Sequence, residues 1–452
     1  MKDIEHKYPY QGNTLVECFK NRISNRTAKV CIIGLGYVGL PLAVEKGKVG
    51  FTVLGIDQNG SRVDKINQGL NYINDVNDEE LKQLVNRGTI KATCNFSEVS
   101  EQDILVICVP TPLNINRDPD ISYVKNVIKE LIQWLRPGQM VILESTTYPG
   151  TTEEIVLPLL ESTGLKVGKD FFLVYSPERV DPGNQRYTTK NTSKVVGGVT
   201  PLCQEVGCFF YVQTITNVVP VSSPTVAEMT KVFENTYRAV NIALVNELMM
   251  LCDKMKINIW EIIDAASTKP FGIQVFYPGP GVGGHCIPID PFYLSWKARQ
   301  YDFSTRFIEL AGEINILVSH YVVSKVIQVL NSKGMSLNGA RILILGVAYK
   351  KDVDDYRESP AIRIIKQLTD FGAQVVFYDP YIRYIEGDDS LLLDVKWVSL
   401  TDNEIKKSDC ILIVTDHSII NYGEIVAQAK VVIDTRNATK AVLNDREKII
   451  LI

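Results

Sequence analysis

A cysteine in a glycine-rich loop is the residue of this sequence best suited to covalent chemistry. The segment GGHCIPID, residues 283–290, places Cys286 after two glycines and ahead of the carboxylate of Asp290. Glycines let a ligand approach the backbone closely. A thiol acts as a nucleophile where it is accessible and where its thiolate is favoured. A structural cysteine in a glycine-rich turn would show the same pattern, so the loop alone leaves both interpretations open.

Polar side chains also lie one turn apart in a helix predicted over residues 224–255. Lys231 and Asn235 share one face of this helix, and Arg238 lies near the same face one turn further on. Lysine and asparagine suit the stabilisation of an oxyanion or of a bound water. An exposed polar stripe is the alternative. Glu178, in a Ser-Pro-Glu-Arg segment after a predicted strand, offers a further carboxylate, although such a segment is also a common turn.

A GxGxxG motif, residues 34–39, stands between a predicted strand and a predicted helix. Gly34 permits the tight turn, Gly36 lets a pyrophosphate approach the backbone, and Gly39 allows the helix to lie close to the strand. The helix N-terminus then faces the phosphates. Asp57 ends the next predicted strand, where a carboxylate accepts ribose hydroxyls and favours NAD over NADP. The motif therefore predicts an NAD-binding site.

Further candidates for contact with NAD surround this motif. Tyr37 and Val38 are its variable positions, and Arg62 lies in the next predicted helix. Thr111 and Thr146 end later strands of the same predicted sheet, and ligands bind at the carboxyl ends of strands in such sheets. A solvated arginine and ordinary loop threonines are the alternative interpretations.

The elements that position these residues form a repeated pattern. Strands alternating with helices predict an α/β protein with doubly wound, parallel sheets. After Gly339 the pattern restarts, because ARILILGVAYKKD corresponds to AKVCIIGLGYVG and three later strands have counterparts in the first copy. Two long predicted helices, 224–255 and about 304–331, lie between the copies. The sequence thus predicts two Rossmann-like domains joined by a central long-helix domain, and the second copy, lacking the full glycine motif, should bind a nucleotide differently.

The composition excludes several classes of protein. The 452 residues are 45% hydrophobic and 22% charged, and the net charge of −4 gives no basic footprint for nucleic acid. Nine cysteines without CxxC pairs and only four histidines indicate a reducing compartment and no metal site. The N-terminus lacks a signal-peptide pattern, and the uncharged stretch at the first predicted strand, residues 30–44, is too short and glycine-rich to span a membrane. We expect a cytoplasmic protein that binds neither nucleic acid nor membrane.

Several motifs, in their order along the chain, resemble those of the nucleotide-sugar 6-dehydrogenase family. They are GLGYVGLPLA, VPTP, ESTTYPGTT, YSPERVDPGN, KVFENTYRAVNIALVNE, GPGVGGHCIPIDPFYLSWKAR and GVAYKKDVDDYRESPA, and they span residues 28 to about 437. The resemblance implies an NAD-dependent oxidoreductase that oxidises the C6 alcohol of a UDP-sugar to a carboxylate, a four-electron reaction that serves polysaccharide biosynthesis.

The resemblance also implies roles for individual residues. Cys286 would capture the sugar carbon as a thiohemiacetal and then a thioester, and Asp290 is the acid that follows it. The groups expected to stabilise the oxyanion, order water and assist hydrolysis are Lys231, Asn235, Glu178 and Thr146. The residues expected at the UDP-sugar are Glu178, Arg179, Lys231, Asn235, Arg238, Gly283, Lys350, Arg357 and Arg436.

One position departs from the pattern of the UDP-glucose dehydrogenases. Their Ser-Pro-Glu motif is typically followed four residues later by a second glutamate, where this chain has Pro182. Together with PERVDPG and GHCIPIDPFYL, this favours the N-acetylhexosamine branch and UDP-GlcNAc as substrate, with UDP-glucose, UDP-ManNAc and UDP-GalNAc as alternatives. More distant alternatives are a 3-hydroxyacid or 6-phosphogluconate type of dehydrogenase, which performs one oxidation without a thiol, and an NAD-responsive regulator without turnover.

From the pattern of predicted strands and helices, together with the resemblance, we expect four parts of the chain. They are a polar, irregular N-terminal extension (1–27), an NAD-binding domain (28–217), a central helical domain with the cysteine loop (218–333), and a UDP-binding domain (334–452). The central helices are longer than two flanking domains need, which predicts a homodimer or a larger homo-oligomer.

Overall fold

The computed structural model describes residues 12–73, 76–114, 116–181, 183–184, 186–385 and 395–452. The chain divides into two compact units, each with its own sheet. Unit 1 runs to Glu234 and includes Trp296–Tyr301, and unit 2 consists of Asn235–Ser295 and Asp302–Ile452.

The sheet of unit 1 consists of β1 (Val30–Ile33), β2 (Val53–Ile56), β3 (Ile90–Thr93), β4 (Ile104–Ile107), β5 (Met140–Leu143), β6 (Phe172–Tyr175), β7 (Lys194–Gly198) and β8 (Val218–Val221). Their order is β3-β2-β1-β4-β5-β6-β7-β8. The first six are parallel, whereas β7 runs antiparallel to β6. Five of them are short apolar runs buried at every position, as strands covered on both faces by helices must be.

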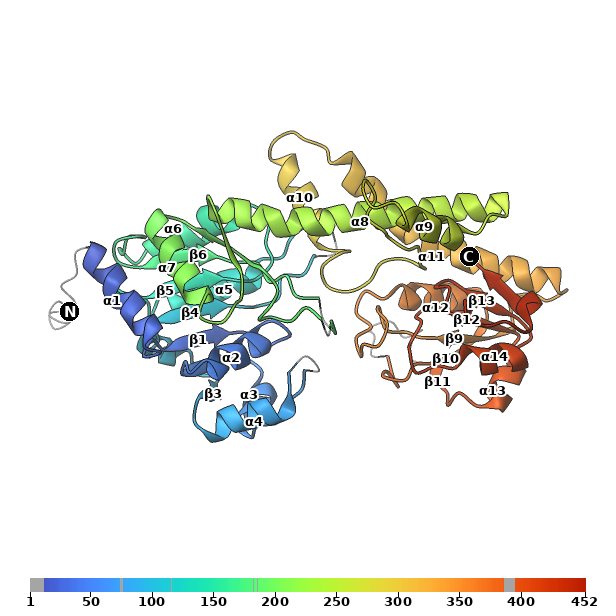
Figure 1. Cartoon of the computed structure of the whole chain (residues 1–452), viewed down its shortest axis with the longest axis horizontal. Helices are drawn as coiled ribbons and strands as arrows, with labels where there is room; N and C mark the ends of the chain where they lie inside the picture. The colour runs from blue at the N-terminus through green and yellow to red at the C-terminus, as the bar shows by residue number, and fades with distance from the viewer. Residues whose placement is uncertain (1–11, 74–75, 115, 182, 185, 386–394) are drawn as a thin grey trace. The chain divides into compact units, whose positions relative to one another are not determined.

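The helices of unit 1 cover this sheet, as Figure 1 shows in blue to green. They include α2 (Gly39–Lys48), α3 (Gly60–Asn67), α4 (Asp78–Asn86), α5 (Ser122–Leu131), the π-helical turn η2 (Thr152–Val156), α6 (Leu157–Glu161) and α7 (Pro201–Tyr211). The expectation of an irregular N-terminal extension is wrong for residues 12–24, which form helix α1 (Gly12–Ser24) against α7. The reason is an apolar stripe at helical spacing, because Val16, Phe19 and Ile23 are all buried in the core of unit 1.

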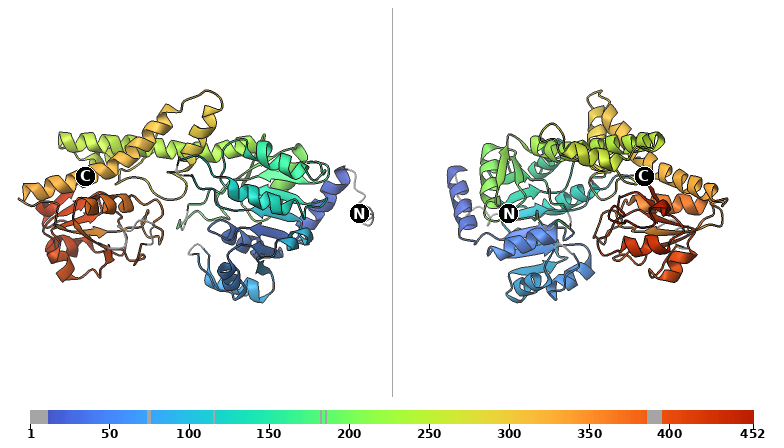
Figure 2. Two further views of the ribbon diagram at one scale, coloured as in Figure 1. Left: turned by 180° about the vertical axis from the view of Figure 1, so that it is seen from behind. Right: turned by 45° about the vertical axis from the view of Figure 1, so that its right-hand side comes forward.

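Unit 2 contains a second parallel sheet, drawn in orange to red in Figure 2. Its strands are β9 (Arg341–Leu345), β10 (Gln374–Tyr378), β11 (Lys396–Trp397), β12 (Cys410–Ile413), β13 (Val432–Asp434) and β14 (Ile449–Leu451), and its helices include α12 (Pro360–Asp370), α13 (Asp402–Lys407) and α14 (Tyr422–Gln428). The order β11-β10-β9-β12-β13-β14 repeats the order of the first six strands of unit 1. The predicted pair of Rossmann-like sheets is therefore confirmed.

Four further helices complete the two units. They are α8 (Pro224–Met255), α9 (Ile259–Ser267), α10 (Asp290–Arg299) and α11 (Arg306–Ser332). Helix α8 begins in unit 1, where Ser223 caps it by accepting the Val226 N–H through Oγ at 3.2 Å, and ends in unit 2.

By length and composition, α11 is the one helix of the described segments that could cross a membrane. Half of its apolar window is buried inside the protein. Val318, Val322 and Val326 of this helix belong to the core of unit 2, as expected for a core helix of a globular domain.

Candidate active site

The glycine turn between β1 and α2 has one glycine that faces open space. A Cβ on Gly34, whose φ is +94°, would lie 2.8 Å from the Cys108 carbonyl oxygen, and a Cβ on Gly39 would lie 1.9 Å from the Gly34 carbonyl oxygen. A Cβ on Gly36, in contrast, would meet no described protein atom within 4 Å. Gly34 and Gly39 are thus required by close contacts of the protein itself, whereas Gly36 leaves room for a pyrophosphate against the backbone.

Asp57 stands at the edge of the same turn, directly after β2. Its Oδ2 accepts the Leu35 N–H at 2.9 Å, and its Oδ1 accepts the Asn59 N–H at 2.8 Å. Arg62, an exposed residue of α3, approaches the carboxylate to 3.5 Å. Tyr72, which the sequence did not single out, fixes the turn by donating its hydroxyl to the Leu35 carbonyl at 2.6 Å. An oriented acid beside an open backbone fits the ribose and pyrophosphate of NAD.

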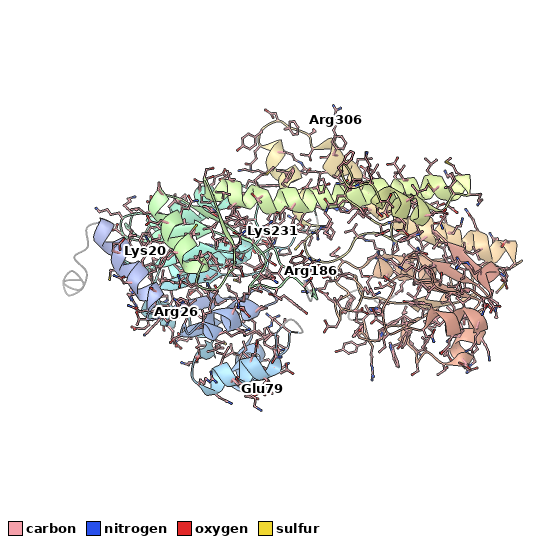
Figure 3. The ribbon with its side chains drawn as sticks, in the orientation of Figure 1. Lys20, Arg26, Glu79, Arg186, Lys231 and Arg306 are labelled. Atoms are coloured by element: carbon pink, nitrogen blue, oxygen red, sulfur yellow. The ribbon has the colours of Figure 1, made fainter. Side chains whose placement is uncertain are left out.

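The ends of β4 and β5 are joined beside the candidate lysine. Thr111 Oγ1 donates to the Thr146 carbonyl at 2.6 Å, and Lys231 Nζ donates to Thr146 Oγ1. Lys231 projects from α8, where Figure 3 labels it, and its side chain is almost wholly buried. The structure therefore brings Thr111, Thr146 and Lys231 together in unit 1.

Glu178 lies after β6 with its carboxylate held on both oxygens. Oε1 accepts the N–H groups of Arg179 and Val180 at 2.7 and 2.8 Å, and Oε2 accepts Lys194 Nζ at 3.1 Å. Burial raises the pKa of the Glu178 carboxyl, but the charge of Lys194 and the Val180 N–H outweigh burial and hold that pKa below its ordinary value. Glu178 is therefore an anion that accepts hydrogen bonds at neutral pH.

Two further predicted substrate residues, Arg179 of unit 1 and Arg238 of unit 2, have different surroundings. The guanidinium of Arg179 binds both carboxylate oxygens of Glu234, with Nε at 3.0 Å from one of them, and donates to the Ser193 carbonyl at 2.8 Å. These bonds fasten the loop after β6 to α8. Arg238 is exposed on α8.

In unit 2 the candidate thiol begins a helical turn. The Cys286 carbonyl accepts the N–H groups of Ile289 and Asp290 at 3.1 and 2.8 Å, so the loop leads directly into α10. Asp290, the first residue of α10, is 2% exposed and accepts Asn235 Nδ2 at 2.6 Å. Cys286 itself is half-buried. One turn of backbone and one hydrogen bond thus join the predicted residues Cys286, Asp290 and Asn235.

The glycines before the cysteine lie on the C-terminal part of unit 2. A Cβ on Gly283 would lie 2.8 Å from the Glu358 carbonyl oxygen, and the Gly284 N–H donates to the Arg357 carbonyl at 3.1 Å. A Cβ on Gly279 would come within 2.5 Å of the Arg436 guanidinium. The cysteine loop therefore runs beside Arg357 and Arg436, two residues predicted at the UDP-sugar.

The residues predicted to contact UDP form different hydrogen bonds and ion pairs within the protein. Arg357 forms a two-pronged ion pair with Asp355, at 2.9 and 2.6 Å. Arg436 Nε donates to the Val414 carbonyl at 3.0 Å, and Lys350 is half-buried in the segment after β9. The segment 349–357 and the loop after β13 thus present three cations in unit 2, which suits a diphosphate.

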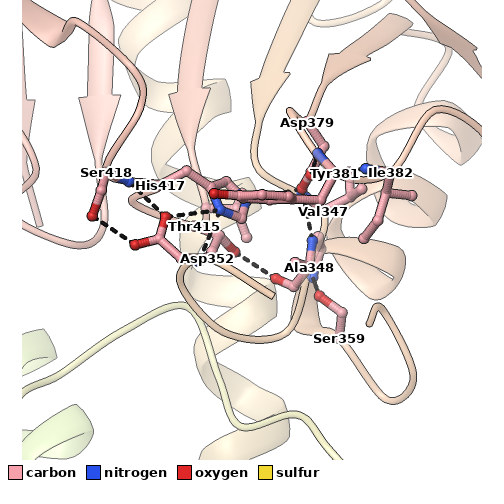
Figure 4. A network of polar contacts seen from close by, with 12 residues as sticks. Val347, Ala348, Asp352, Ser359, Asp379, Tyr381, Ile382, Thr415, His417 and Ser418 are labelled. Atoms are coloured by element: carbon pink, nitrogen blue, oxygen red, sulfur yellow. Dashed lines mark hydrogen bonds and ion pairs between the residues drawn. The ribbon is translucent and has the colours of Figure 1, made fainter. Parts of the chain in front are cut away.

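The acid of the second Rossmann-like copy is held in a network of polar contacts, which Figure 4 draws. Asp379 follows β10 as Asp57 follows β2, and its Oδ2 accepts the N–H groups of Val347 and Ala348 at 2.8 and 3.0 Å. Asp379 is fully buried, and His417 Nε2 lies 3.0 Å from Oδ2. Since a ribose cannot reach a buried acid, this copy has to bind a nucleotide in another way.

The same histidine also organises a predicted substrate segment. His417 Nδ1 accepts the Asp352 N–H at 3.0 Å, and Ser418 donates to the Asp352 carboxylate through its N–H at 2.8 Å and its hydroxyl at 2.6 Å. The loop that carries Lys350 and Arg357 is thereby tied to the loop after β12.

Comparison with known proteins identifies related sequences over most of the chain. Models of the UDP-glucose/GDP-mannose dehydrogenase family match residues 28–215 (NAD binding domain), 225–316 (central domain) and 343–441 (UDP binding domain).

Individual relatives and a solved structure show the same likeness. The UDP-N-acetyl-D-glucosamine 6-dehydrogenase of Pseudomonas aeruginosa is 37% identical over 356 residues, which cover 78% of this chain and 83% of that protein. The UDP-N-acetyl-D-mannosamine dehydrogenase of Pyrococcus horikoshii is 34% identical over 418 residues, or 91% of this chain and 96% of that protein. The structure of the UDP-D-ManNAc dehydrogenase from Pyrococcus horikoshii superposes with a TM-score of 0.83 at 32% identity, covering 94% of this chain and 98% of that chain.

Two glycine substitutions should separate cofactor binding from folding. Gly36→Ala is expected to raise the Kd for NAD⁺ by about tenfold or more, equivalent to about 1.4 kcal/mol, with little change in thermal stability, because its Cβ meets only the space of the pyrophosphate. Gly39→Ala is expected to cost about 1–3 kcal/mol of stability, because its Cβ collides with the Gly34 carbonyl. Calorimetric titration and thermal unfolding of the ligand-free proteins measure both effects. Equal destabilisation by the two changes would contradict this assignment.

Proposed function

We infer the reaction from the family: the chain belongs to the UDP-glucose/GDP-mannose dehydrogenase family and is an NAD-dependent UDP-sugar 6-dehydrogenase. We propose that it oxidises a UDP-N-acetylhexosamine through a thioester on Cys286. Relatives named for UDP-GlcNAc and for UDP-ManNAc, at 37% and 34% identity, support an N-acetylhexosamine. Within that class we propose UDP-GlcNAc, with UDP-ManNAc, UDP-GalNAc and UDP-glucose as alternatives. Pro182, the sequence position that argues against glucose, lies outside the described residues.

The observation that carries the covalent step is the setting of Cys286. It is the half-buried thiol of a glycine-rich loop, and the turn it begins ends on an aspartate held by Asn235. Cys31 and Cys410, in contrast, lie in strands and are buried in apolar surroundings. Burial raises their pKa above the ordinary value of a thiol. A buried thiol of that kind is a poor nucleophile, so Cys286 is the better candidate.

The proposed reaction consists of two oxidations and a hydrolysis. NAD⁺, when bound, accepts a hydride in each oxidation. In the first, C6 of the sugar loses a hydride and its hydroxyl loses a proton, which gives the aldehyde. The Cys286 thiolate then bonds to this carbon, and protonation of the oxygen gives a thiohemiacetal. Loss of a second hydride and of the hydroxyl proton gives the thioester, and water releases the carboxylate and the thiol.

Each neighbouring group then has a chemical task. Lys231, a buried cation, stabilises the negative charge that develops on the substrate oxygen in each oxidation. Asn235 and Asp290 form a hydrogen-bonded pair that positions water near the thiol. Thr146, held by Lys231, and Glu178, held as an anion, order the water that attacks the thioester. Lys350, Arg357 and Arg436 contact the UDP part.

Replacing the thiol tests the covalent step. Cys286→Ser is expected to form no thioester and to yield no uronic acid, because a serine hydroxyl does not add to the aldehyde as a thiolate does, so at most the aldehyde and one NADH per sugar appear. Mass spectrometry of quenched enzyme and trapping of the aldehyde by a hydrazine measure this. Cys94→Ser removes an exposed thiol and serves as the matched control. Full conversion to the acid by Cys286→Ser would refute the covalent role.

The yield of NADH distinguishes the alternatives. A panel of UDP-GlcNAc, UDP-ManNAc, UDP-GalNAc and UDP-glucose should show two NADH per molecule of UDP-GlcNAc, and the slowest turnover with UDP-glucose. One NADH per substrate would favour a dehydrogenase of the 3-hydroxyacid type, and NAD binding without turnover would favour a regulator. Rapid oxidation of UDP-glucose alone would show that the N-acetyl group is not recognised.

We also propose a homodimer formed by the helices of unit 2. Exposed apolar residues follow one stripe of α8: Tyr237 (43% exposed), Leu244 (53%), Leu248 (40%), Leu251 (51%) and Met255 (56%). Their spacing of three, four and seven residues places them on one face of the helix. Helix α11 adds Phe307 (77%), Leu310 (51%) and Leu317 (52%). Exposed apolar residues gathered on one face of a helix mark protein interfaces.

A charged substitution in this stripe tests the dimer. Leu248→Asp combined with Leu251→Asp is expected to convert a dimer to a monomer in analytical ultracentrifugation, because two buried carboxylates at an interface have no partners. Leu443→Asp, at an 85% exposed leucine outside the central helices, should leave the mass unchanged. A monomeric wild-type protein at working concentration would contradict the proposed homodimer.

A further inference from the structure

A buried lysine links two carboxylates beneath the loop that carries Glu178. Lys194 Nζ donates to Glu144 Oε2 at 2.8 Å and to Glu178 Oε2 at 3.1 Å. Lys194 and Glu144 are only 4% and 1% exposed. The hydroxyl of Tyr211, itself fully buried, donates to the other carboxylate oxygen of Glu144. Neither Lys194 nor Glu144 belongs to the groups predicted to do chemistry.

The direction of β7 explains why these groups meet. Glu144 follows β5 and Glu178 follows β6, so both lie at the carboxyl edge of the parallel strands. Strand β7 is antiparallel to β6, so its first residue, Lys194, returns to that same edge. A parallel strand would begin at the opposite edge of the sheet.

The cluster consists of one ammonium and two carboxylates. Burial lowers the pKa of Lys194, but the charges of Glu144 and Glu178 outweigh burial and raise it above the ordinary value, so the ammonium stays charged. Glu144 alone would neutralise this lysine, yet the lysine also reaches Glu178, whose side chain is 12% exposed at the end of the strand. The ion pair thus extends from the interior to a group at the candidate site.

The hydrogen bonds to Glu178 also fix its direction. The N–H groups of Arg179 and Val180 bind one oxygen, and Lys194 binds the other. A carboxylate has about four acceptor positions, so three donors hold it and leave one position for a water. A group held in this way is an oriented acceptor.

We propose that Lys194 is a positioning residue for the dehydrogenase reaction, holding Glu178 ionised and in one orientation so that it accepts a hydrogen bond from the water that hydrolyses the thioester. This inference rests on the proposed role of Glu178. In that step the water oxygen bonds to the thioester carbon, and the carbon–sulfur bond breaks with its electron pair on the sulfur. One water proton goes to the sulfur of Cys286 and the other to solvent. Glu144 and Tyr211 hold Lys194 from the interior.

Removing the ammonium should slow hydrolysis specifically. Lys194→Met is expected to lower kcat by roughly 10²-fold, with little change in KM for either substrate, and to let the thioester accumulate in quenched enzyme. The acidic limb of the kcat–pH profile should move to higher pH, because burial then raises the pKa of Glu178 without the opposing charge. Lys194→Arg keeps the charge and should restore the position of that limb.

Two further variants separate positioning from folding. Glu144→Gln with Lys194→Met removes both buried charges together, so neither is left unpaired, and it should still accumulate thioester. Lys325→Met breaks a comparable ion pair in unit 2, where Nζ lies 2.7 and 2.6 Å from the two oxygens of Asp253, and should lower stability without moving the acidic limb.

The outcomes distinguish this inference from the function on which it rests. Glu178→Gln is expected to accumulate thioester as Lys194→Met does. If Glu178→Gln hydrolyses the thioester at the wild-type rate, the proposed role of Glu178 fails. If Glu178→Gln is slow but Lys194→Met and the double variant hydrolyse normally, or lose activity without thioester and without a shifted limb, the assignment of Lys194 is overturned.

Discussion

Parallel pairing in unit 1 sends its first six strands to one common edge, and the candidate site depends on this constraint. The strands are apolar and buried, so polar groups are tolerated only after each strand ends. Gly34 follows β1, Asp57 follows β2, Thr146 follows β5 and Glu178 follows β6. Positions far apart in the chain meet at this edge because of backbone hydrogen bonding within the sheet.

Two lysines of unit 1 are buried in different surroundings. Lys194 is surrounded by carboxylates and remains an ammonium. Lys46 of α2 is fully buried and bonds to the Phe210 carbonyl at 3.3 Å and the Thr214 hydroxyl at 2.6 Å, over the Phe210 ring. Burial lowers the pKa of Lys46 well below its ordinary value. The contrast shows that the carboxylates, and not burial, decide the charge of Lys194.

Much of the fold could be predicted because it follows from local sequence patterns. The start of α8 follows from a serine cap and a proline, and the parallel, doubly wound sheets follow from the alternation of strands and helices. The reversal of β7 and the partners of Lys194 could not be predicted, since they depend on contacts between distant segments. The ion pair between Arg179, a predicted substrate residue, and Glu234 could not be predicted for the same reason. The helix over residues 12–24 was missed because its short apolar stripe lies among polar residues.

The sealing of Asp379 has a consequence for the order of events in turnover. Within the described parts of the chain, Asp57 stands at an open glycine turn, whereas its counterpart Asp379 lies under His417. If the chain performs the two oxidations proposed above, the spent cofactor has to leave and a fresh one has to enter between them. During that exchange an unattached aldehyde could hydrate or diffuse away. In the proposed mechanism a covalent bond to Cys286 would retain the half-oxidised sugar during the exchange, which would give the thiol a second purpose, that of a tether.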